Sequence, residues 1–479
     1  MNGSSSQAHP GARPLGERAF AALVVAYAAI LLLYYPATYA IDDESNILSL
    51  AASIGQGTVF LEQAQIDLDA DLPWRGHLIS KFSPLHAALL SPALLTRWRL
   101  AFLLSAVFAA WGAFIFRDML RREALSSGWT VLYFANPGLL YYSRTLLAMV
   151  PAAVVALLGA SLLFRPRHRP VLGALALGGA ALLHLWIAPV AIALALGWWL
   201  ERGGLRLRAG LLLILGALPA VVLLASYNWL TTGSPFLNAY WIIGVQHAFQ
   251  FSHFAGFAVF YALSLLLAPP AGWAALVPRW AGNVTIPGTI LVVVTLASSY
   301  YYRDGMGYGV AGWVPGQRFL LPASLLACVP AARYLAALSC RFNFSARVRG
   351  WLLTTAVGVC IAVWLAISVS HQAYLQAQAA VQAAIRTHIP SGARVIGNSS
   401  VVKAFAPVNG RWTLRQFRDG EAPPAPLPDG AYVAWLGPPR QPMPPEWLAG
   451  RSASVVPARS WVWNRDLWIA PPVHTDRAE

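Results

Sequence analysis

Long apolar runs alternate with short polar stretches along the first three quarters of the chain. Because a helix needs about 20 apolar residues to cross the hydrocarbon core of a bilayer, this pattern predicts a polytopic membrane protein. Charged residues divide the pattern into about eleven expected spans, near residues 19–40, 100–116, 129–142, 147–164, 171–185, 186–200, 209–227, 255–276, 284–300, 318–338 and 350–370. We therefore predict an all-α transmembrane domain over residues 19–370, preceded by a short tail over residues 1–18.

Arginine clusters between the apolar runs predict how the chain is oriented in the membrane. The strongest clusters are Arg117 to Arg122, Arg165 to Arg169, Arg202 to Arg208 and Arg341 to Arg349. All of them fall on one side if residues 171–200 form a tight hairpin of two short helices and residues 84–96 do not cross. Since Lys and Arg gather on the cytoplasmic side of membrane proteins, we expect this side, with the amino-terminal tail, to be the cytoplasm.

The opposite side is then expected to carry a long outer loop and a soluble domain. The loop spans residues 41–99 and ends in an amphipathic piece, Phe82 to Leu95, which predicts one or more helices lying along the membrane surface. Residues 371–479 are richer in proline and polar residues and predict a small extracytoplasmic α/β domain. Its expected strands lie at 393–397, 431–436 and 461–469.

Composition changes this picture little. The chain has 479 residues, 57% of them hydrophobic and 11% charged, with a formal net charge of +15. In a soluble protein this charge would indicate nucleic-acid binding, but here the arginines lie between apolar runs, where the positive-inside bias explains them. The three cysteines show no spacing typical of a disulfide framework or a zinc site. The abundance of Ala, Arg and Pro favours a bacterium, so we expect a bacterial inner membrane.

The first apolar run is similar to a signal peptide, because Arg13 and Arg18 precede it and Thr38-Tyr39-Ala40 is an acceptable cleavage site. The run is nevertheless longer than the hydrophobic region of a typical signal peptide. We therefore expect an uncleaved first helix.

Three carboxylates, Asp42, Asp43 and Glu44, follow directly on the first apolar run. A carboxylate within hydrogen-bond reach of a hydroxyl group can take its proton as the oxygen attacks. Crowded carboxylates also raise one another's pKa, which favours a base that is active near neutral pH. The three residues are therefore catalytic candidates. A solvated acidic start to an external loop explains them equally well.

Three cations, Lys81, Arg144 and Arg318, lie on the predicted outer side, and the two arginines run against the positive-inside tendency. A lysine at the membrane surface can meet a lipid phosphate as a point charge, and the planar guanidinium of arginine suits bidentate phosphate recognition. For Lys81, a side chain that merely reaches toward the headgroups is a common alternative. His86 follows on an apolar helix, where packing is a commoner role than catalysis.

Two further outer segments contribute candidates for substrate binding. Arg303 and Asp304 share the outer loop before Arg318, although an ion pair with neighbouring loops is the simpler role for them. Tyr240 lies in a turn-rich aromatic loop that begins near Gly233. Aromatic faces suit sugar rings, but interfacial belts of Trp and Tyr are equally expected at this position.

Taken together, these features resemble the membrane glycosyltransferases of the GT-C superfamily, which include protein O-mannosyltransferases, the lipid A aminoarabinose transferase and mycobacterial arabinofuranosyltransferases. The resemblance covers most of residues 20–338 and rests on four passages in the same order. They are Asp42-Asp43-Glu44 with Leu50-Ala51-Ala52 and Gly55-Gln56-Gly57; Lys81-Phe82-Ser83-Pro84-Leu85-His86, similar to the family's Lys-aromatic-Pro-Pro-Leu; Tyr142-Ser143-Arg144 leading to Val150-Pro151; and Gly316-Gln317-Arg318-Phe319-Leu320-Leu321-Pro322. The loop Gly233-Ser234-Pro235-Phe236 is also similar to the family.

The resemblance implies an enzyme that takes a sugar from a polyprenyl-phosphate-sugar donor. The acceptor would be a hydroxyl group of a cell-envelope glycan, lipid or protein on the extracytoplasmic side. By the same likeness, Asp43 (or Asp42) would be the general base, with inversion at the anomeric carbon. Lys81, Arg144 and Arg318 would neutralise the lipid phosphate as it leaves.

The chain departs from the family pattern at two places. The family often has a second acid shortly before the Val-Pro of the third passage, where this chain has Ala148-Met149, and two prolines where this chain has Ser83-Pro84. The missing acid leaves a two-carboxylate or metal-bridged site open, with Glu44 or Asp304 as candidates to compensate. Some family members bind a divalent cation, and oxygen ligands exist in this chain, but the sequence assigns no metal site and no other cofactor.

Two other functional classes stay open. A transporter or lipid flippase would use the same charged residues as a binding site, yet transporters tend to place such sites near the membrane midplane and often show internal repeats. No repeat is evident, and the charge lies at the outer edge. The missing acid also keeps open a catalytically inactive scaffold.

Overall fold

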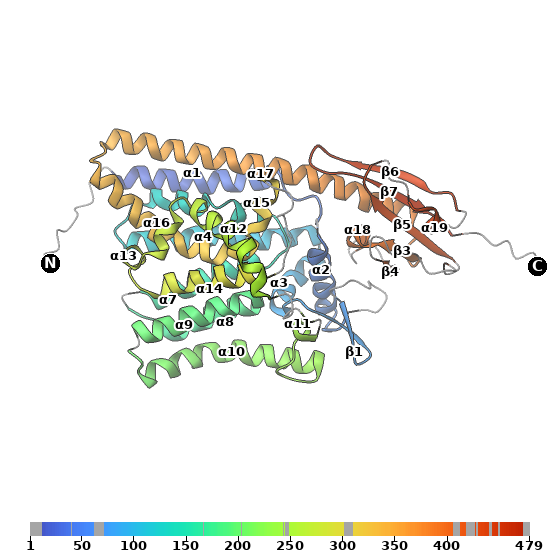
Figure 1. Ribbon diagram of the computed structural model, residues 1–479, viewed down its shortest axis with the longest axis horizontal. Coiled ribbons are helices and arrows are strands. Elements are labelled where there is room, and N and C mark those ends of the chain that lie inside the picture. Colours follow the sequence, from blue (N-terminus) through green and yellow to red (C-terminus); the bar gives the residue numbers. More distant parts are fainter. Residues whose placement is uncertain are drawn as a thin grey trace, which may run out of the picture.

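The protein is a bundle of helices with a small sheet at one end. The helices run side by side along the long axis of the molecule, and the sheet lies beyond one end of them (Figure 1). The computed structural model describes residues 12–39, 41–61, 71–165, 167–202, 204–242, 244, 249–300, 310–405, 412–417, 427, 430–439, 443–448 and 451–472. The predicted fold class, a helical membrane domain followed by a small carboxy-terminal α/β unit, agrees with this architecture.

Five of the described helical segments are long and apolar enough to cross a membrane. They are Leu15–Leu33 in α1 (Ala12–Leu33), Trp98–Arg122 in η1 (Trp98–Ala101) and α4 (Phe102–Arg122), α10 (Leu207–Thr232), Trp313–Arg341 across α15 (Val310–Gly316), η8 (Gln317–Leu320) and α16 (Leu321–Arg341), and α17 (Ala346–His388). On α10 many large apolar side chains, such as Leu211, Ile214 and Val222, are exposed. An apolar surface on all sides is expected of a helix that lies in a membrane.

The remaining apolar helices are shorter, so the predicted number of spans is not confirmed. They are α3 (Pro84–Leu94), α7 (Met149–Leu163), α8 (Pro170–Leu183), η3 (Leu185–Ile187), α9 (Ala188–Glu201), η5 (Phe251–His253), α12 (Phe254–Leu267) and α14 (Thr285–Ser299). The helices α8 and α9 form the tight hairpin that the arginine pattern predicts. Glycines bring α7 and α8 together: a Cβ on Gly159 would lie 2.7 Å from the Leu177 side chain, a close approach typical of membrane helices.

The predicted span over residues 129–142 is not a single helix. It is divided into η2 (Ser127–Thr130), α5 (Val131–Phe134) and α6 (Pro137–Tyr142). The break has a local cause, because the side chain of Asn136 accepts a hydrogen bond from the backbone N–H of Leu139 at 3.1 Å and Pro137 occupies the first position of α6. Both features begin a new helix.

Acidic side chains tie the basic clusters together at the end of the bundle where α1 begins. Glu17 in α1 accepts hydrogen bonds from Arg117 and from Arg121, the latter at 2.9 Å. At the same end, Arg333 of α16 forms an ion pair with Glu123 at 2.8 Å. The arginine-rich connections thus share one end of the molecule, opposite the sheet (Figure 1).

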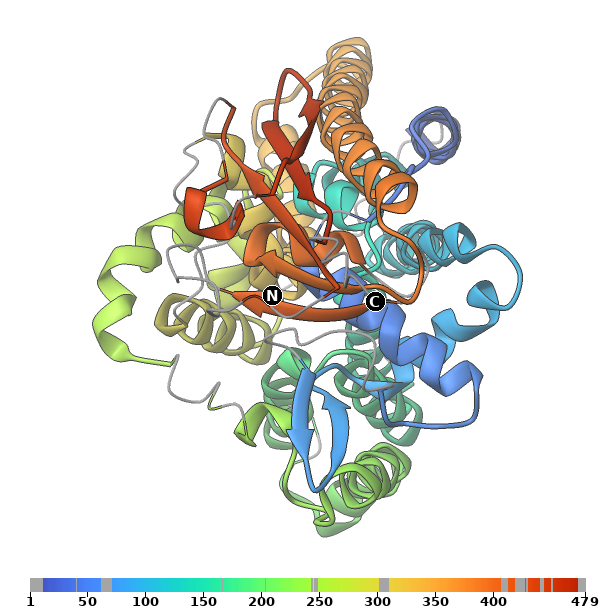
Figure 2. The same ribbon diagram turned by 90° about the vertical axis from the view of Figure 1, so that its right-hand side faces the viewer.

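The segment predicted as an outer loop lies at the other end of the bundle and is mostly structured. It contains α2 (Asp42–Gly55), a hairpin of β1 (Asp71–Trp74) and β2 (His77–Ser80), and α3, which packs against α2. Figure 2 looks onto this end and shows α2 and the hairpin beside the sheet. The helical domain also contains the short helices α11 (Ala239–Ile242), η6 (Gly272–Leu276) and α13 (Pro278–Ala281).

The carboxy-terminal sheet has five strands in the order β4-β3-β5-β7-β6. They are β3 (Arg394–Asn398), β4 (Thr413–Phe417), β5 (Ala431–Gly437), β6 (Ser454–Arg459) and β7 (Asn464–Ala470), with α18 (Ser399–Val402), η9 (Lys403–Phe405) and α19 (Pro445–Leu448) between them. The three predicted strands correspond to β3, β5 and β7. The strand β3 is parallel to both its neighbours, whereas β7 is antiparallel to both of its own.

The helix α17 continues without a break from the bundle into the sheet domain. It is 43 residues long, and its Val381, Ala384 and Ile385 join the apolar core beneath the sheet. The predicted domain boundary between residues 370 and 371 therefore falls inside this helix.

Candidate active site

Asp43 lies in the first turn of α2, where cations from two distant parts of the chain contact its carboxylate. Arg318 in η8 donates a hydrogen bond from Nη2 to Oδ2 of Asp43 at 2.7 Å. Lys81, between β2 and α3, places its Nζ 3.6 Å from Oδ1. A helix dipole alone favours carboxylates at the start of α2, but it does not account for two converging cations. Three residues predicted from the sequence thus meet in one cluster.

The cluster is held by electrostatics in a largely desolvated place. The side chain of Arg318 is only 6% exposed, so its charge is weakly screened by water. Burial by itself would raise the pKa of Asp43, but the charges of Arg318 and Lys81 outweigh it and hold that pKa below its usual value. Asp43 is therefore ionised at neutral pH. Because two cations face one carboxylate, the cluster keeps an excess of positive charge that suits an anion.

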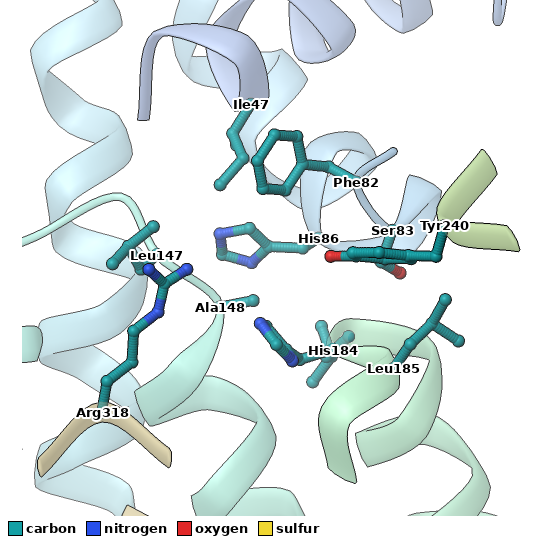
Figure 3. A pocket seen from close by; sticks show the side chains of 11 residues that line it. Ile47, Phe82, Ser83, His86, Leu147, Ala148, His184, Leu185, Tyr240 and Arg318 are labelled. Atoms are coloured by element: carbon teal, nitrogen blue, oxygen red, sulfur yellow. The ribbon is translucent and has the colours of Figure 1, made fainter. Parts of the chain in front are cut away.

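A small pocket opens beside Arg318. Its empty volume is about 330 Å³, including space open to solvent, and its lining residues are Ile47, Phe82, Ser83, His86, Leu147, Ala148, Leu183, His184, Leu185, Tyr240 and Arg318. Figure 3 shows Arg318 on one side, Tyr240 and Ser83 on the other, and the rings of His86 and His184 between them. The candidates Arg318, His86 and Tyr240 therefore share one pocket.

The turn at the end of α10 positions Tyr240, which forms part of the pocket wall. Gly233 ends α10 with φ of +77°, a left-handed conformation that glycine adopts without strain, and a Cβ at this position would clash with Arg75 in the hairpin. Nε1 of Trp74 donates a hydrogen bond to the carbonyl oxygen of Thr232 at 3.1 Å. The hairpin thus fixes the turn that leads into α11 and Tyr240.

Glu44 is not part of the cluster that Asp43 forms with Arg318 and Lys81. It is 1% exposed, and both carboxylate oxygens accept hydrogen bonds from backbone N–H groups, Oε1 from Leu146 at 2.8 Å and Oε2 from Ile41 at 3.2 Å. Glu44 thereby joins the start of α2 to the segment that enters α7. This geometry favours a structural role for Glu44 and leaves Asp43 as the carboxylate that meets the cations.

Replacing Glu44 with glutamine is expected to destabilise the fold. The amide offers one acceptor oxygen where two N–H groups need acceptors, so a buried donor faces an N–H₂ group, which costs about 1–3 kcal/mol. Thermal unfolding of the purified protein in detergent should show a lower Tm. The exposed Glu123→Gln variant, which removes one charge from a surface ion pair, should change the Tm much less; equal shifts would contradict the assigned role.

Arg144, predicted to bind the donor phosphate, lies away from the pocket. It is 1% exposed, and its Nη2 donates hydrogen bonds to the carbonyl oxygen of Tyr34 at 2.6 Å and to Oε1 of Gln372 at 3.2 Å. It therefore connects the end of α1 to α17. Arg303 and Asp304 lie outside the described residues, as does the side chain of Asp42.

The pocket also contains residues that the sequence did not single out for it. His184 follows the last residue of α8, and its only signal in the sequence is that of one polar residue at the end of an apolar run. Ser83 precedes α3, and its Oγ is buried with no hydrogen-bond partner among the described residues. Ala148 lines the pocket as well, so the carboxylate that the family often has here is missing from the pocket itself.

The described residues do not fit a divalent cation. Within the described part of the chain, no group of three or more His, Cys, Asp or Glu side chains is placed to hold a metal ion. At Asp43 the positive charge comes from Arg318 and Lys81, one on each carboxylate oxygen.

Comparison with solved structures places this fold among known membrane enzymes. The crystal structure of ArnT from Cupriavidus metallidurans bound to undecaprenyl phosphate matches with a TM-score of 0.57 and 15% sequence identity, over 93% of this chain and 97% of that chain. The apo state of the same enzyme matches with a TM-score of 0.55 and 14% identity over the same shares of both chains.

A third solved structure matches more weakly, and the sequence comparisons found no match. The apo structure of the oligosaccharyltransferase from Archaeoglobus fulgidus matches with a TM-score of 0.43 and 11% identity, over 83% of this chain and 64% of that chain, which is too low to support an argument. No protein-family profile and no curated protein sequence matches the chain. ArnT is a lipid A aminoarabinose transferase, so the similarity over nearly the whole length of both chains shows that this protein has the fold of the GT-C membrane glycosyltransferases.

Proposed function

We propose that the protein transfers a sugar from a polyprenyl-phosphate carrier to a hydroxyl group of an acceptor, at the end of the bundle that bears the sheet. The observation that carries the proposal is the cluster of Asp43, Arg318 and Lys81 beside a pocket. It combines an anion site with a carboxylate that can take a proton. The undecaprenyl phosphate bound to the structurally similar ArnT supports this choice of donor.

Arg318 and Lys81 are the proposed phosphate ligands. Arg318 lies just before α16, within a segment long enough to cross the membrane. A lipid phosphate could reach it while its polyprenyl chain stays in the bilayer. The hydroxyl of Ser83 and the N-terminal end of α3, which lie at the same pocket, add hydrogen-bond donors for an anion. All of these groups would stabilise the negative charge that develops on the leaving phosphate.

The proposed reaction is a single displacement. The acceptor oxygen forms a bond to the anomeric carbon while the bond from that carbon to the phosphate oxygen breaks, and the electron pair stays on the carrier phosphate. The acceptor proton passes to Asp43, and the configuration at the anomeric carbon inverts. Arg318 and Lys81 keep the pKa of free Asp43 low. As the phosphate draws these cations toward itself, the pKa of Asp43 should rise, which makes it a better base when the donor is bound.

The positions of the arginine clusters support an orientation for this proposal. They lie at the end of the bundle opposite the pocket, and by the positive-inside bias the pocket and residues 371–479 would then be outside the cytoplasm and the tail at 1–18 inside. In a bacterial inner membrane the acceptor would then be a glycan, lipid or protein of the cell envelope. The amino-terminal helix stays attached in this arrangement, since it is packed against α17.

Lipid mass spectrometry on membranes from a deletion strain and its parent tests the proposal. Loss of the transferase should cause a polyprenyl-phosphate-sugar to accumulate, and its mass would identify the sugar. Unchanged carrier lipids would contradict the proposal. Purified protein in vesicles separates the rivals: movement of the carrier across the bilayer without transfer would indicate a flippase, and carrier binding with neither activity would indicate a scaffold.

A further inference from the structure

His86 presents to the pocket a hydrogen-bond acceptor that has no partner in the described part of the chain. Its Nε2 lies 2.6 Å from the carbonyl oxygen of Leu146, and because a carbonyl only accepts hydrogen bonds, Nε2 must carry the hydrogen. In the neutral ring Nδ1 is then a bare lone pair. The ring is 2% exposed, and Nδ1 has no hydrogen-bond partner among the described residues. Buried polar atoms of this kind are rare in native structures, since leaving them unpaired is costly.

His184 presents the opposite group to the same pocket. The backbone N–H of Trp186 donates to its Nδ1 at 3.2 Å, so in the neutral ring the hydrogen is on Nε2. Arg318 lines the same pocket, and its positive charge disfavours a second cation beside it. The ring is therefore neutral at physiological pH and offers an N–H donor.

The two rings are fixed in complementary tautomers by the backbone. Figure 3 shows the two rings one above the other in the middle of the pocket, with Ala148 beside them and Arg318 to their left. A phosphate or carboxylate only accepts hydrogen bonds and would meet the lone pair of His86. An ammonium group only donates and would meet the N–H of His184. A hydroxyl group satisfies both rings, since it donates and accepts at once.

We propose that His86 and His184 bind one hydroxyl group of the donor sugar, which donates to Nδ1 of His86 and accepts from Nε2 of His184. This inference rests on the proposed function, which places the donor phosphate at Arg318 and Lys81. A sugar attached to that phosphate would enter the pocket beside Arg318, where the two histidines lie. The sugar would then carry a hydroxyl, rather than a charged substituent, at the position that reaches them.

Side chains that mimic one ring nitrogen at a time give a reciprocal test. An asparagine amide ends one bond beyond Cγ, where Nδ1 stands, and a glutamine amide ends one bond farther out, near Nε2. His86→Asn can keep the acceptor in the pocket, whereas His86→Gln keeps only the bond to Leu146. At His184 the roles of the two nitrogens are exchanged, because Nε2 faces the pocket and Nδ1 accepts from Trp186. His184→Gln can therefore keep the donor in the pocket, whereas His184→Asn keeps only the bond from Trp186.

The probes are bare undecaprenyl phosphate and undecaprenyl phosphates that carry glucose, galactose, mannose or arabinose. Binding to the purified full-length protein identifies the sugar that binds most tightly relative to the bare carrier. We expect His86→Gln and His184→Asn to weaken binding of that sugar-carrier about tenfold, with no change for the bare carrier. His86→Asn and His184→Gln should lose clearly less, and an unchanged Tm would show that each variant is folded.

Each other outcome has a defined meaning. If no sugar-carrier binds more tightly than the bare carrier, or if the paired variants lose affinity equally, the hydroxyl subsite is wrong while carrier binding stands. A loss of transfer with unchanged donor affinity would assign the histidines to the acceptor and overturn the inference. If bare undecaprenyl phosphate does not bind, or binds equally well to Arg318→Gln, the proposed function itself fails.

Discussion

Replacing Asp43 with asparagine is expected to lower the rate of sugar transfer by a factor of about 10² to 10⁴, the range that proton transfer by a positioned side chain contributes. The amide oxygen can still accept the hydrogen bond from Arg318, so the fold should be kept. The substitution removes the negative charge that competes with the phosphate for Arg318 and Lys81. Binding of undecaprenyl phosphate should therefore be unchanged or tighter, which a binding assay beside the transfer assay would show.

A matched control exists at the opposite end of the bundle. Asp118 is also a carboxylate between two arginines, Arg122 and Arg165, and Asp118→Asn should leave the transfer rate unchanged. Asp42→Asn addresses the alternative base. A normal rate in Asp42→Asn together with loss in Asp43→Asn supports Asp43, and the reverse pattern assigns the base to Asp42. Near-normal turnover of Asp43→Asn would exclude Asp43 from the role.

Replacing Arg318 with glutamine is expected to weaken binding of undecaprenyl phosphate about 100-fold. Arg318 is buried, and truncating one partner of a buried charge pair costs on the order of 2–5 kcal/mol, because the hydrogen-bonded charge is strongly felt in a desolvated place. Lys81 remains and keeps some affinity. Transfer should slow as well, since less positive charge faces the leaving phosphate.

Arg333→Gln is the corresponding control for Arg318. Arg333 pairs with Glu123 and donates to the carbonyl oxygen of Trp280 at 2.8 Å, at the end of the bundle away from the pocket. Its loss should leave carrier affinity unchanged when measured on the same preparation of membranes. Equal affinity of the native protein and Arg318→Gln would remove Arg318 from the phosphate site.

The three residues of the charged cluster could be singled out from the sequence because their signals are local. Asp43, Lys81 and Arg318 are charged residues at the borders of apolar runs, and such residues are costly to place there without a function. The helical class and the three strands β3, β5 and β7 also follow from local patterns. Long apolar runs indicate membrane helices, and short runs of apolar residues that alternate with polar ones indicate strands. The weaker edge strands β4 and β6 lack that pattern and were not predicted.

Features that depend on contacts between distant segments could not be read in this way. Arg144 carries the same local signal as Arg318, but the carbonyl of Tyr34 and the amide of Gln372 reach it only in the folded chain. Glu44 carries the same negative charge as its neighbour Asp43, but in the folded chain its side chain turns toward Leu146. His184 enters the pocket because the hairpin of α8 and α9 ends beside Arg318, and a pattern of hydrophobic positions does not report that contact.

The length of α17 sets the distance between the sheet and the far end of the helical bundle. At 1.5 Å per residue its 43 residues extend about 65 Å, roughly twice the hydrocarbon thickness of a bilayer. The bonds from Arg144 to Gln372 and from Thr38 to Gln382 clamp the helix where it leaves the bundle. The helix is thus a spacer of fixed height, and η9 of the sheet domain rests against α2. In the proposed reaction, the length of this helix would set how near the sheet domain lies to an acceptor at Asp43, and so which acceptors can reach the pocket.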